Sequence, residues 1–493
     1  MSMVTKMAQN RCEEKVAVRR QVQAHEGPRR RAIHYREGMA QPARDDVEST
    51  DLHLFDPPCG PVAGIVDGAV VRSSAIPYAR ADRFAAPEPC AVWTVAHHCE
   101  QPAPACPQLP SPLVTAMFGG PPTALVADED CQRLTITRPA GEIDTPLPVM
   151  VWVHGGSYVL GAGDEAHHDP TTLVVEQNVI VVAVTYRLGV LGFLGDGSSE
   201  RPANLGLLDL IAALDWVHDN IAAFGGDPDQ ITCVGQSAGA DAVAHLMTVP
   251  RATRRFRRAI LQSAPFGIRW NRSDMARDLF SRTMEFDDST GLDEILSVQQ
   301  KLIVDGPRYG LTGAMPFGVQ YGLEPLPAES DVEEAWAESA SDIDLLVGCN
   351  RDEIEFFVPG VPIAETASHV PILGRPIRRV VTSLITRRVY SAPTADFARK
   401  HAAAGGRVVD YRVHWHAPGN NLGAAHCIEL PLLFGVEEQW EGAQLLEGAT
   451  WEQVEEAGRV LRAIWGRFLR GEDLGECEPL EARSVLRYRQ VSA

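Results

Sequence analysis

A serine bounded by glycines is the strongest sign of chemistry in this chain. The run Gly-Gln-Ser-Ala-Gly at residues 235–239 follows the short apolar stretch 231–234 and precedes a series of small residues. A strand that turns sharply into a helix exposes such a serine, and the glycines allow a tight turn with close neighbouring backbone. We therefore expect Ser237 to be a nucleophile at a strand-to-helix elbow. The alternative is an ordinary glycine-rich turn with a solvated serine.

A nucleophilic serine needs a general base, and the base needs a carboxylate that orients it. At an elbow of this kind the acid and then the histidine follow the serine along the chain. Residues 345–349 predict a strand, and the loop after it carries Asp352 and Glu353. Active-site groups are expected at the carboxyl end of a parallel strand. Both carboxylates are therefore candidates.

The candidate base is His426. It lies among small residues just before an apolar run, where an imidazole could come close to the elbow. Any of the 15 histidines of the chain could lie in such a position. His414 and His416 are the nearest rivals, but they alternate along the predicted strand 408–415.

Donors for an oxyanion are expected after another apolar strand. Residues 147–153 run directly into His-Gly-Gly-Ser at 154–157. Free N–H groups in such a turn stabilise the negative charge of a tetrahedral intermediate. We expect the N–H groups of Gly156, Ser157 and Ala238 to form an oxyanion hole, with an ordinary turn as the alternative.

The remaining pattern predicts an α/β fold with a mainly parallel sheet. The continuous apolar runs 147–153 and 179–185 are typical of central strands covered on both faces. Residues 204–224 predict a helix with one apolar stripe, with Asn204 as its N-cap and Gly225 as its end. Further strands are expected at 60–71, 73–83, 134–137, 257–263, 343–348 and 408–415.

Composition excludes several classes of protein. The net charge of −20 argues against a nucleic-acid-binding surface or a basic membrane patch. The sequence contains no apolar run of 18 residues, so we expect no membrane span. It also shows no apolar signal segment, so we expect a cytoplasmic protein. The ten cysteines form no metal-like cluster, so we expect no metal and no cofactor. The oligomeric state is not indicated.

Residues 1–57 differ from the rest of the chain. Residues 1–50 carry ten Lys and Arg against seven Asp and Glu, with little apolar periodicity. Such a segment does not bury enough apolar surface to fold. We expect a disordered extension at 1–57 and one folded domain at 58–493. A tail that binds an acidic partner is the alternative.

The sequence from Gly60 to the C-terminus resembles the type-B carboxylesterase/cholinesterase family of α/β-hydrolases. The resemblance implies the α/β-hydrolase fold, a triad of Ser237, His426 and Glu353, and an acid that is Glu353 rather than Asp352. The blocks that carry it are Ile76-Pro77-Tyr78-Ala79, Cys106-Pro107-Gln108, Glu129-Asp130-Cys131, His154-Gly155-Gly156, Asn204 to Asp209, Phe224 to Gly239, Arg258 to Ser263, Asp352-Glu353 and His426.

The same resemblance suggests supporting residues. It places Ser263 and Glu429 near the catalytic histidine, and Trp270 where relatives have a wall of the acyl pocket. Gln236, directly before the nucleophile, occupies a position where the family commonly has Glu. Cys106 and Cys131 match a family disulfide, although a reducing cytosol would keep them as thiols.

Several positions depart from the family pattern. Ser157 replaces a third glycine beside the oxyanion hole, and Ala240 replaces another glycine. Gln132 and Arg133 replace an apolar-aromatic pair, and the interval from Glu353 to His426 (426 − 353 = 73) is short for the family. No tryptophan lies between Cys106 and Cys131, where cholinesterases keep a cation-binding one, and Gln236 is neutral. Choline esters are therefore disfavoured.

The sequence thus predicts a serine carboxylester hydrolase that acts on small to medium esters through an acyl-enzyme. One alternative is a non-catalytic scaffold of the same fold. Another keeps the triad but cleaves amides, carbamates or thioesters, because pocket shape sets that choice.

Overall fold

The computed structural model describes residues 52–99, 101–120, 125–360 and 374–492. Strand β1 (Leu52–Phe55) pairs antiparallel with β2 (Val62–Asp67), so the folded part already includes residues 52–55, which we had assigned to the extension. Residues 56–57 of that predicted extension are also described, whereas residues 1–51 lie outside the described residues. No helix in the described part of the chain is both long and apolar enough to cross a membrane.

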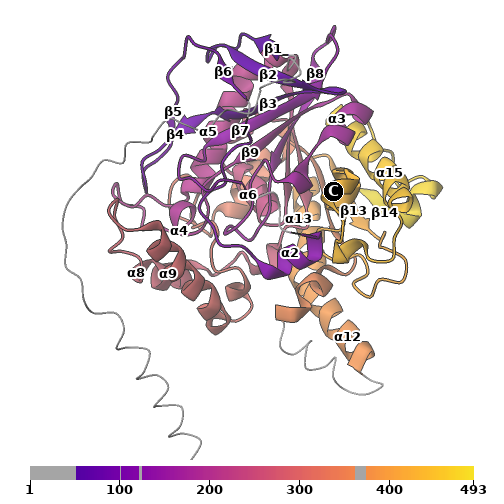
Figure 1. Cartoon of the computed structure of the whole chain (residues 1–493). Helices are drawn as coiled ribbons and strands as arrows, with labels where there is room; N and C mark the ends of the chain where they lie inside the picture. Colours follow the sequence, from indigo (N-terminus) through magenta and orange to yellow (C-terminus); the bar gives the residue numbers. More distant parts are fainter. Residues whose placement is uncertain (1–51, 100, 121–124, 361–373, 493) are drawn as a thin grey trace, which may run out of the picture. The chain divides into compact units, whose positions relative to one another are not determined.

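Twelve strands of the described chain form one twisted sheet (Figure 1). The neighbours β9–β8–β10–β11–β12–β13 are all parallel, whereas the β1–β2–β3–β7–β9 side and the last pair, β13–β14, are antiparallel. The predicted parallel sheet is therefore its central part. The other strands are β3 (Val70–Pro77), β6 (His97–His98), β7 (Arg133–Pro139), β8 (Leu147–Val153), β9 (Ile180–Thr185), β10 (Gly226–Gln236), β11 (Arg258–Gln262), β12 (Asp344–Asn350), β13 (Val408–Val413) and β14 (Leu486–Val491), while β4 (Ala79–Arg80) and β5 (Glu88–Pro89) form a separate pair.

Helices cover both faces of this sheet. The longer ones are α5 (Leu205–Asn220), α6 (Ala238–Leu246), α8 (Ser273–Ser281), α9 (Leu292–Asp305), α10 (Val332–Ser339), α12 (Gly374–Thr386), α13 (Ala392–Ala403) and α15 (Trp451–Leu469). The shorter ones are α2 (Pro112–Phe118), α3 (Thr171–Gln177), α4 (Gly189–Gly192), α7 (Pro250–Thr253) and α14 (Glu429–Leu433). Helices α5, α6 and α13 pack on one face, and α3 and α15 pack on the other.

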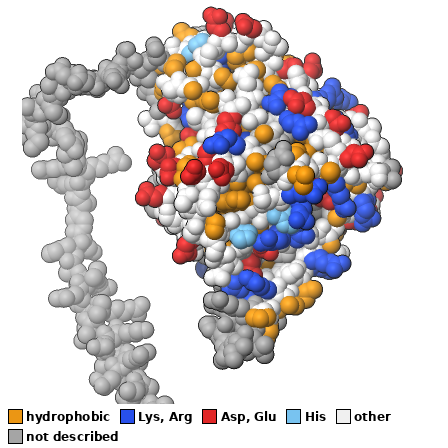
Figure 2. Space-filling model, turned by 90° about the vertical axis from the view of Figure 1, so that its right-hand side faces the viewer, with side chains coloured by type: hydrophobic (Ala, Val, Ile, Leu, Met, Phe, Trp, Pro, Cys, Tyr) orange, Lys and Arg blue, Asp and Glu red, His pale blue; other side chains and the backbone are white. Residues whose placement is uncertain are grey.

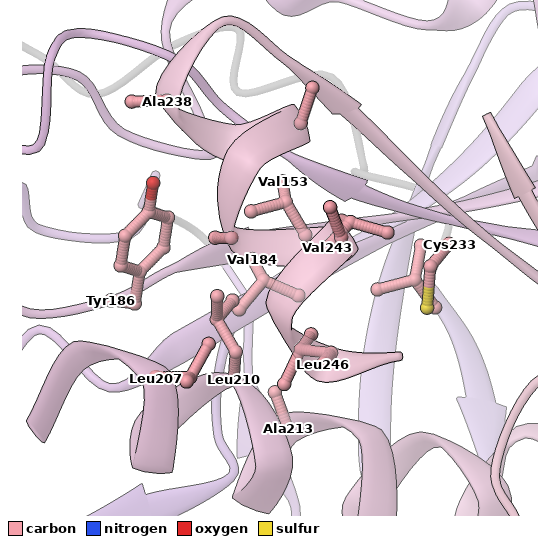
Figure 3. Packing of buried hydrophobic residues seen from close by; sticks show 14 of the residues in the cluster. Val153, Val184, Tyr186, Leu207, Leu210, Ala213, Cys233, Ala238, Val243 and Leu246 are labelled. Carbon is pink, nitrogen blue, oxygen red and sulfur yellow. The ribbon is translucent and has the colours of Figure 1, made fainter. Parts of the chain in front are cut away.

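Strand β8 shows why the central strands are continuously apolar. Alternate residues of a strand point to opposite faces. Val149, Val151 and Val153 belong to the core beneath α5 and α6, while Met150 and Trp152 belong to the core beneath α3 and α15. Both faces are thus buried, as the apolar run predicted. Figure 3 shows the first core around α6 and α5.

The helix predicted at 204–224 is present, with a 3₁₀ turn at its end. Residues Leu205–Asn220 form α5 and Ile221–Phe224 a 3₁₀ turn, which ends at Gly225 in the left-handed region (φ 85°), as predicted. Asn204 occupies the N-cap position, as predicted, but its side chain makes no capping hydrogen bond to the helix. Its amide instead bonds Gln320, both donating to and accepting from the backbone. Asn204 therefore fastens a distant loop to the start of α5.

Candidate active site

Ser237 lies at the turn between β10 and α6, as predicted. Its backbone has φ 54° and ψ −120°, a conformation that costs free energy in a residue with a side chain. Its N–H donates to the carbonyl of Gln262 at 2.7 Å, which fixes the turn to β11. A Cβ on Gly239 would lie 2.1 Å from the Val153 carbonyl oxygen, and one on Gly235 would lie 2.4 Å from the Gly239 carbonyl oxygen. Both glycines are therefore needed for close backbone packing.

The glycine loop after β8 lies against this turn. A Cβ on Gly155 would lie 2.4 Å from Gln236 Oε1 and 3.2 Å from Ser237 Cβ. Among the hydrogen bonds of the described residues, none uses the N–H of Gly156 or Ser157. The structure therefore places two free donors in a loop that contacts the elbow. Ala238 begins α6, where the N–H groups of a first turn lack partners within the helix.

Ser157 has left-handed backbone geometry (φ 56°). Glycine adopts this region without cost, whereas a side chain there costs about 1–2 kcal/mol. This explains why a glycine is favoured at such a position. The substitution noted in the sequence therefore places strain, as well as a hydroxyl group, beside the two free donors.

Glu353 and His426 form a direct pair. His426 Nδ1 lies 2.5 Å from Glu353 Oε2, and the His426 N–H donates to the Glu353 carbonyl at 3.3 Å. The other carboxylate oxygen, Oε1, accepts from the N–H of Asn350 at 2.6 Å. Glu353 is fully buried and His426 is 2% exposed. The carboxylate is thus held by two donors in a dry environment.

Asp352, the other candidate acid, fastens the histidine loop. Its Oδ2 accepts from the N–H of Ala424 at 3.0 Å, and its own N–H donates to the Ala424 carbonyl at 2.8 Å. Asn350 donates through Nδ2 to the Ala425 carbonyl at 2.9 Å. Residues 350–353 therefore hold residues 424–426 at three successive positions. We call this arrangement the acid–histidine clamp.

Glu429 belongs to the same network. Its Oε2 accepts from Asn350 Nδ2 at 2.5 Å, and it is fully buried. Burial, followed by the charge of Glu353, raises the pKa of Glu429 above its ordinary value. The Glu353 carboxylate contacts His426 directly, whereas Glu429 contacts Asn350.

The pKa of His426 is raised above its ordinary value. Burial on its own lowers this pKa, while Cys427, Tyr390 and Glu353 raise it. Burial also raises the pKa of Cys427 and of Tyr390, so both groups keep their protons at neutral pH. The charge that acts on the imidazole at neutral pH is therefore that of Glu353.

Gln236 contacts the other nitrogen of His426. Gln236 Nε2 lies 3.3 Å from His426 Nε2 and 3.3 Å from Cys427 Sγ. If Nδ1 carries the proton that is shared with Glu353, Nε2 accepts from this amide. The hydrogen bonds found among the described residues include none from Ser237 Oγ to His426. Gln236 thus occupies the lone pair that the serine hydroxyl would need.

Three aromatic residues that the sequence reasoning missed surround the imidazole. The ring centroids of Phe357, Tyr390 and Phe356 lie 5.2, 5.4 and 5.9 Å from that of His426. The Phe356-Phe357 pair follows Glu353 closely in the sequence, so its position could have predicted that it lies near the histidine. Tyr390 belongs to the π-helical segment Arg387–Ser391, and no feature of the sequence indicated that it lies near His426.

Other predicted residues lie elsewhere or remain untested. Trp270 stacks on Tyr321 at 5.6 Å and lies beside Arg269, and no contact with the elbow is found for it. Ser263 is buried with its Oγ unpaired within the described chain, so its supporting role stays a prediction. His414 and His416 follow β13. The backbone N–H of His414 donates to the Val485 carbonyl, and His416 Nδ1 contacts the Ala417 carbonyl.

The described chain shows no group of three or more His, Cys, Asp or Glu side chains that could hold a metal ion. Cys106 and Cys131, which match a family disulfide, are both buried free thiols. A hydrogen bond between the Cys131 thiol and Cys106, followed by burial, raises the pKa of Cys131.

Comparison with known proteins identifies the family. The model of the carboxylesterase family matches residues 56–370, which is more than half of the chain. The chain belongs to the carboxylesterase family. This membership confirms the α/β-hydrolase fold and the enzyme class, a serine carboxylester hydrolase.

Relatives cover most of this carboxylesterase. A probable N-octanoylanthranilate hydrolase of Rhodococcus erythropolis is 37% identical over 420 residues, 84% of this chain and 91% of that protein. The para-nitrobenzyl esterase of Bacillus subtilis is 33% identical, over 83% of this chain and 88% of that one. A solved thermophilic para-nitrobenzyl esterase superposes with a TM-score of 0.71 at 29% identity and covers 85% of this chain and 90% of its own.

Proposed function

We propose that Ser237 is the nucleophile, His426 the general base and Glu353 the carboxylate that orients the base. The observation that carries the proposal is the 2.5 Å contact between His426 Nδ1 and Glu353 Oε2, next to the elbow. A carboxylate at Nδ1 fixes the tautomer in which Nε2 can take a proton, and it stabilises the imidazolium that results. The substrates are small to medium carboxylic esters.

In the first half-reaction Ser237 Oγ attacks the ester carbonyl while its proton passes to His426 Nε2. Before this step, Nε2 must exchange its contact with Gln236 for one with the serine hydroxyl. The tetrahedral intermediate then collapses: the bond to the leaving oxygen breaks, and His426 returns the proton to the alkoxide. Water repeats the sequence on the acyl-enzyme, releasing the carboxylic acid and restoring Ser237.

The oxyanion hole consists of the N–H groups of Gly156, Ser157 and Ala238. Within the described chain two of them have no other acceptor; Ala238 follows the nucleophile, and the loop of Gly156 and Ser157 contacts the elbow through Gly155. Such donors are worth most in a site from which water is excluded, and Ser237 is only 8% exposed. Gln236, Ser263 and Glu429 are proposed to support the catalytic histidine; Trp270 stays the candidate wall of the acyl pocket, although its described contacts are with Tyr321 and Arg269 rather than with the elbow.

A second candidate activity is amide cleavage by the same triad. The relative named for N-octanoylanthranilate, an N-acyl compound, favours it. Two substrates with one acyl chain separate the alternatives: p-nitrophenyl octanoate and N-(4-nitrophenyl)octanamide. A kcat/KM for the amide equal to or above that for the ester would make the protein an amidase. A cytoplasmic location also stays a prediction, which cell fractionation would test.

The direct test is a fluorophosphonate, with the adduct mapped by mass spectrometry. We expect one adduct, on Ser237, that is lost in His426→Ala. An adduct on another serine would reject the assignment. A folded protein that forms no adduct would favour the scaffold alternative, since an assembled triad activates its serine.

A further inference from the structure

A second site is indicated on the last two strands of the sheet. Strands β13 and β14 turn Val409, Tyr411 and Tyr488 into the core beneath α15. Their alternate residues point to the opposite face, toward α13. On that face, outside the apolar core, Arg412 lies opposite Arg487, and Asp410 lies opposite Arg489.

The two cross-strand pairs differ in charge balance. Asp410 and Arg489 form an ion pair at 3.4 Å. Arg412 and Arg487 are like charges directly opposite one another, an arrangement that destabilises a sheet. Among the described residues, neither is in an ion pair. Arg412 donates only to the carbonyl of Arg351, at 3.2 Å. The sheet therefore carries two neighbouring positive charges that, within the described residues, form no ion pair.

These arginines line a hollow of about 540 Å³ between the strands and α13. Arg387 and His414 line it as well, and the charges of Arg487, Arg351 and Arg412 add to burial in lowering the pKa of His414. In Figure 2, basic side chains with histidine among them gather on the face turned to the viewer, although the whole chain has a net charge of −20.

Two residues that line this hollow carry buried polar atoms with no partner among the described residues. Thr394, near the start of α13, lines it and is 2% exposed, and its Oγ1 has no partner within the described chain. Arg412 Nε is likewise buried and unpaired within those residues. Leaving buried donors unsatisfied is costly, so native proteins usually pair them with a group of their own, water or a ligand. Both atoms can donate to the same acceptor type, an oxyanion.

We propose that this hollow binds a soluble phosphate-bearing anion, such as inorganic phosphate or a small phosphate monoester. Guanidinium groups match the oxygen geometry of phosphate and bind it by paired hydrogen bonds. A dianion between Arg412 and Arg487 cancels their repulsion, and the Thr394 hydroxyl supplies a further donor. Among the described residues Asp410 is the one carboxylate that lines the hollow, and Arg489 balances its charge.

The site is distinct from the catalytic centre but adjoins it. Arg412 bonds the carbonyl of Arg351, at the base of the loop that carries Glu353. Ser237 and His426 do not line this hollow. Phosphate bound here would not be the ester substrate.

Calorimetry and thermal unfolding test the proposal with inorganic phosphate and phenyl phosphate, at ionic strength matched with NaCl. The test variant is Arg487→Gln. Its control is Arg254→Gln, an exposed arginine that does not line the hollow. We expect the wild type and the control to bind both anions and to gain Tm, and Arg487→Gln to bind at least about tenfold more weakly.

Ligand-free stability separates a binding role from a structural one. Because Arg487→Gln removes a like-charge pair, its Tm without ligand should equal or exceed that of the wild type, with esterase activity unchanged. Thr394→Val keeps every charge and should weaken binding about two- to tenfold.

Three results would overturn the proposal. These are no binding of either anion by the wild type at about 10 mM, equal binding by Arg487→Gln, and binding to phosphatidic-acid vesicles without binding to soluble phosphates. The last result would make the hollow part of a membrane-binding surface.

Discussion

Replacing Gln236 with methionine should speed the reaction. The Gln236 amide lies 3.3 Å from His426 Nε2, the atom that must accept the serine proton. That separation is at the long end of hydrogen-bond distances, so the bond is weak and neutral. Its net worth is about 0.5–1.5 kcal/mol. Methionine has nearly the same length as glutamine but no hydrogen-bond donor. The substitution therefore removes the competing bond to His426 and should raise kcat/KM by about two- to twelvefold.

The assay compares kcat/KM for p-nitrophenyl butyrate with the rate of fluorophosphonate inactivation, which reports serine activation without product release. Both should rise together in Gln236→Met. The exposed Gln444→Met is the matched control and should leave both unchanged. A tenfold fall in both rates with an unchanged Tm would refute the reasoning, because Gln236 would then assist His426 rather than compete with Ser237.

The remaining predictions concern the catalytic groups and their neighbours. Ser237→Ala should lower kcat by at least about 10⁴-fold in an ester assay, since no other nucleophile replaces it; a residual rate near that of the wild type would reject the triad. The pKa of His426 is raised, and its neutral form is the base. The value of kcat/KM should therefore increase with pH along a curve whose midpoint lies above about 6.5. Glu353→Gln should move that midpoint down and also lower the rate; an unmoved midpoint would contradict the role of its charge. Ser157→Gly should give equal or higher activity and unchanged or slightly higher stability in thermal melts, as it relieves a left-handed side chain; a sharp loss of activity would mean that the hydroxyl itself helps. The raised pKa of Glu429 contributes stability at low pH that is lost as pH rises through the folded-state pKa, so Glu429→Gln should match the wild type in acid and exceed its Tm in alkali; equal melts at every pH would show that Glu429 does not titrate with folding.

The central elements of the fold were predictable because their signal is local. Residues 147–153 are apolar without interruption, and β8 occupies the same residues because both of its faces are buried. The glycines at 235 and 239 likewise stand where backbone comes within contact of backbone. Sequence alone located the elbow for the same reason.

What the sequence left open depends on contacts between distant residues. Asp352 and Glu353 are adjacent and chemically alike, and only the position of the loop at 424–426 gives them different partners. Asn204 looked like a helix cap, but its amide bonds a segment more than a hundred residues away. Tyr390 contacts His426 from a π-helical turn, which no apolar periodicity in the sequence predicts.

The acid–histidine clamp has a consequence for how this enzyme can diversify. Residues 350–353 hold residues 424–426 directly by hydrogen bonds, so part of the geometry of Glu353 and His426 is fixed without the chain between them. Helix α12 is the part of this interval that can vary most, because among the described residues Tyr390 packs on His426 and β13 pairs with β12, whereas α12 has no hydrogen bond to either catalytic side chain. It is therefore the natural place to transplant segments from relatives with other acyl preferences, because the graft would change what reaches Ser237 without rebuilding what activates it.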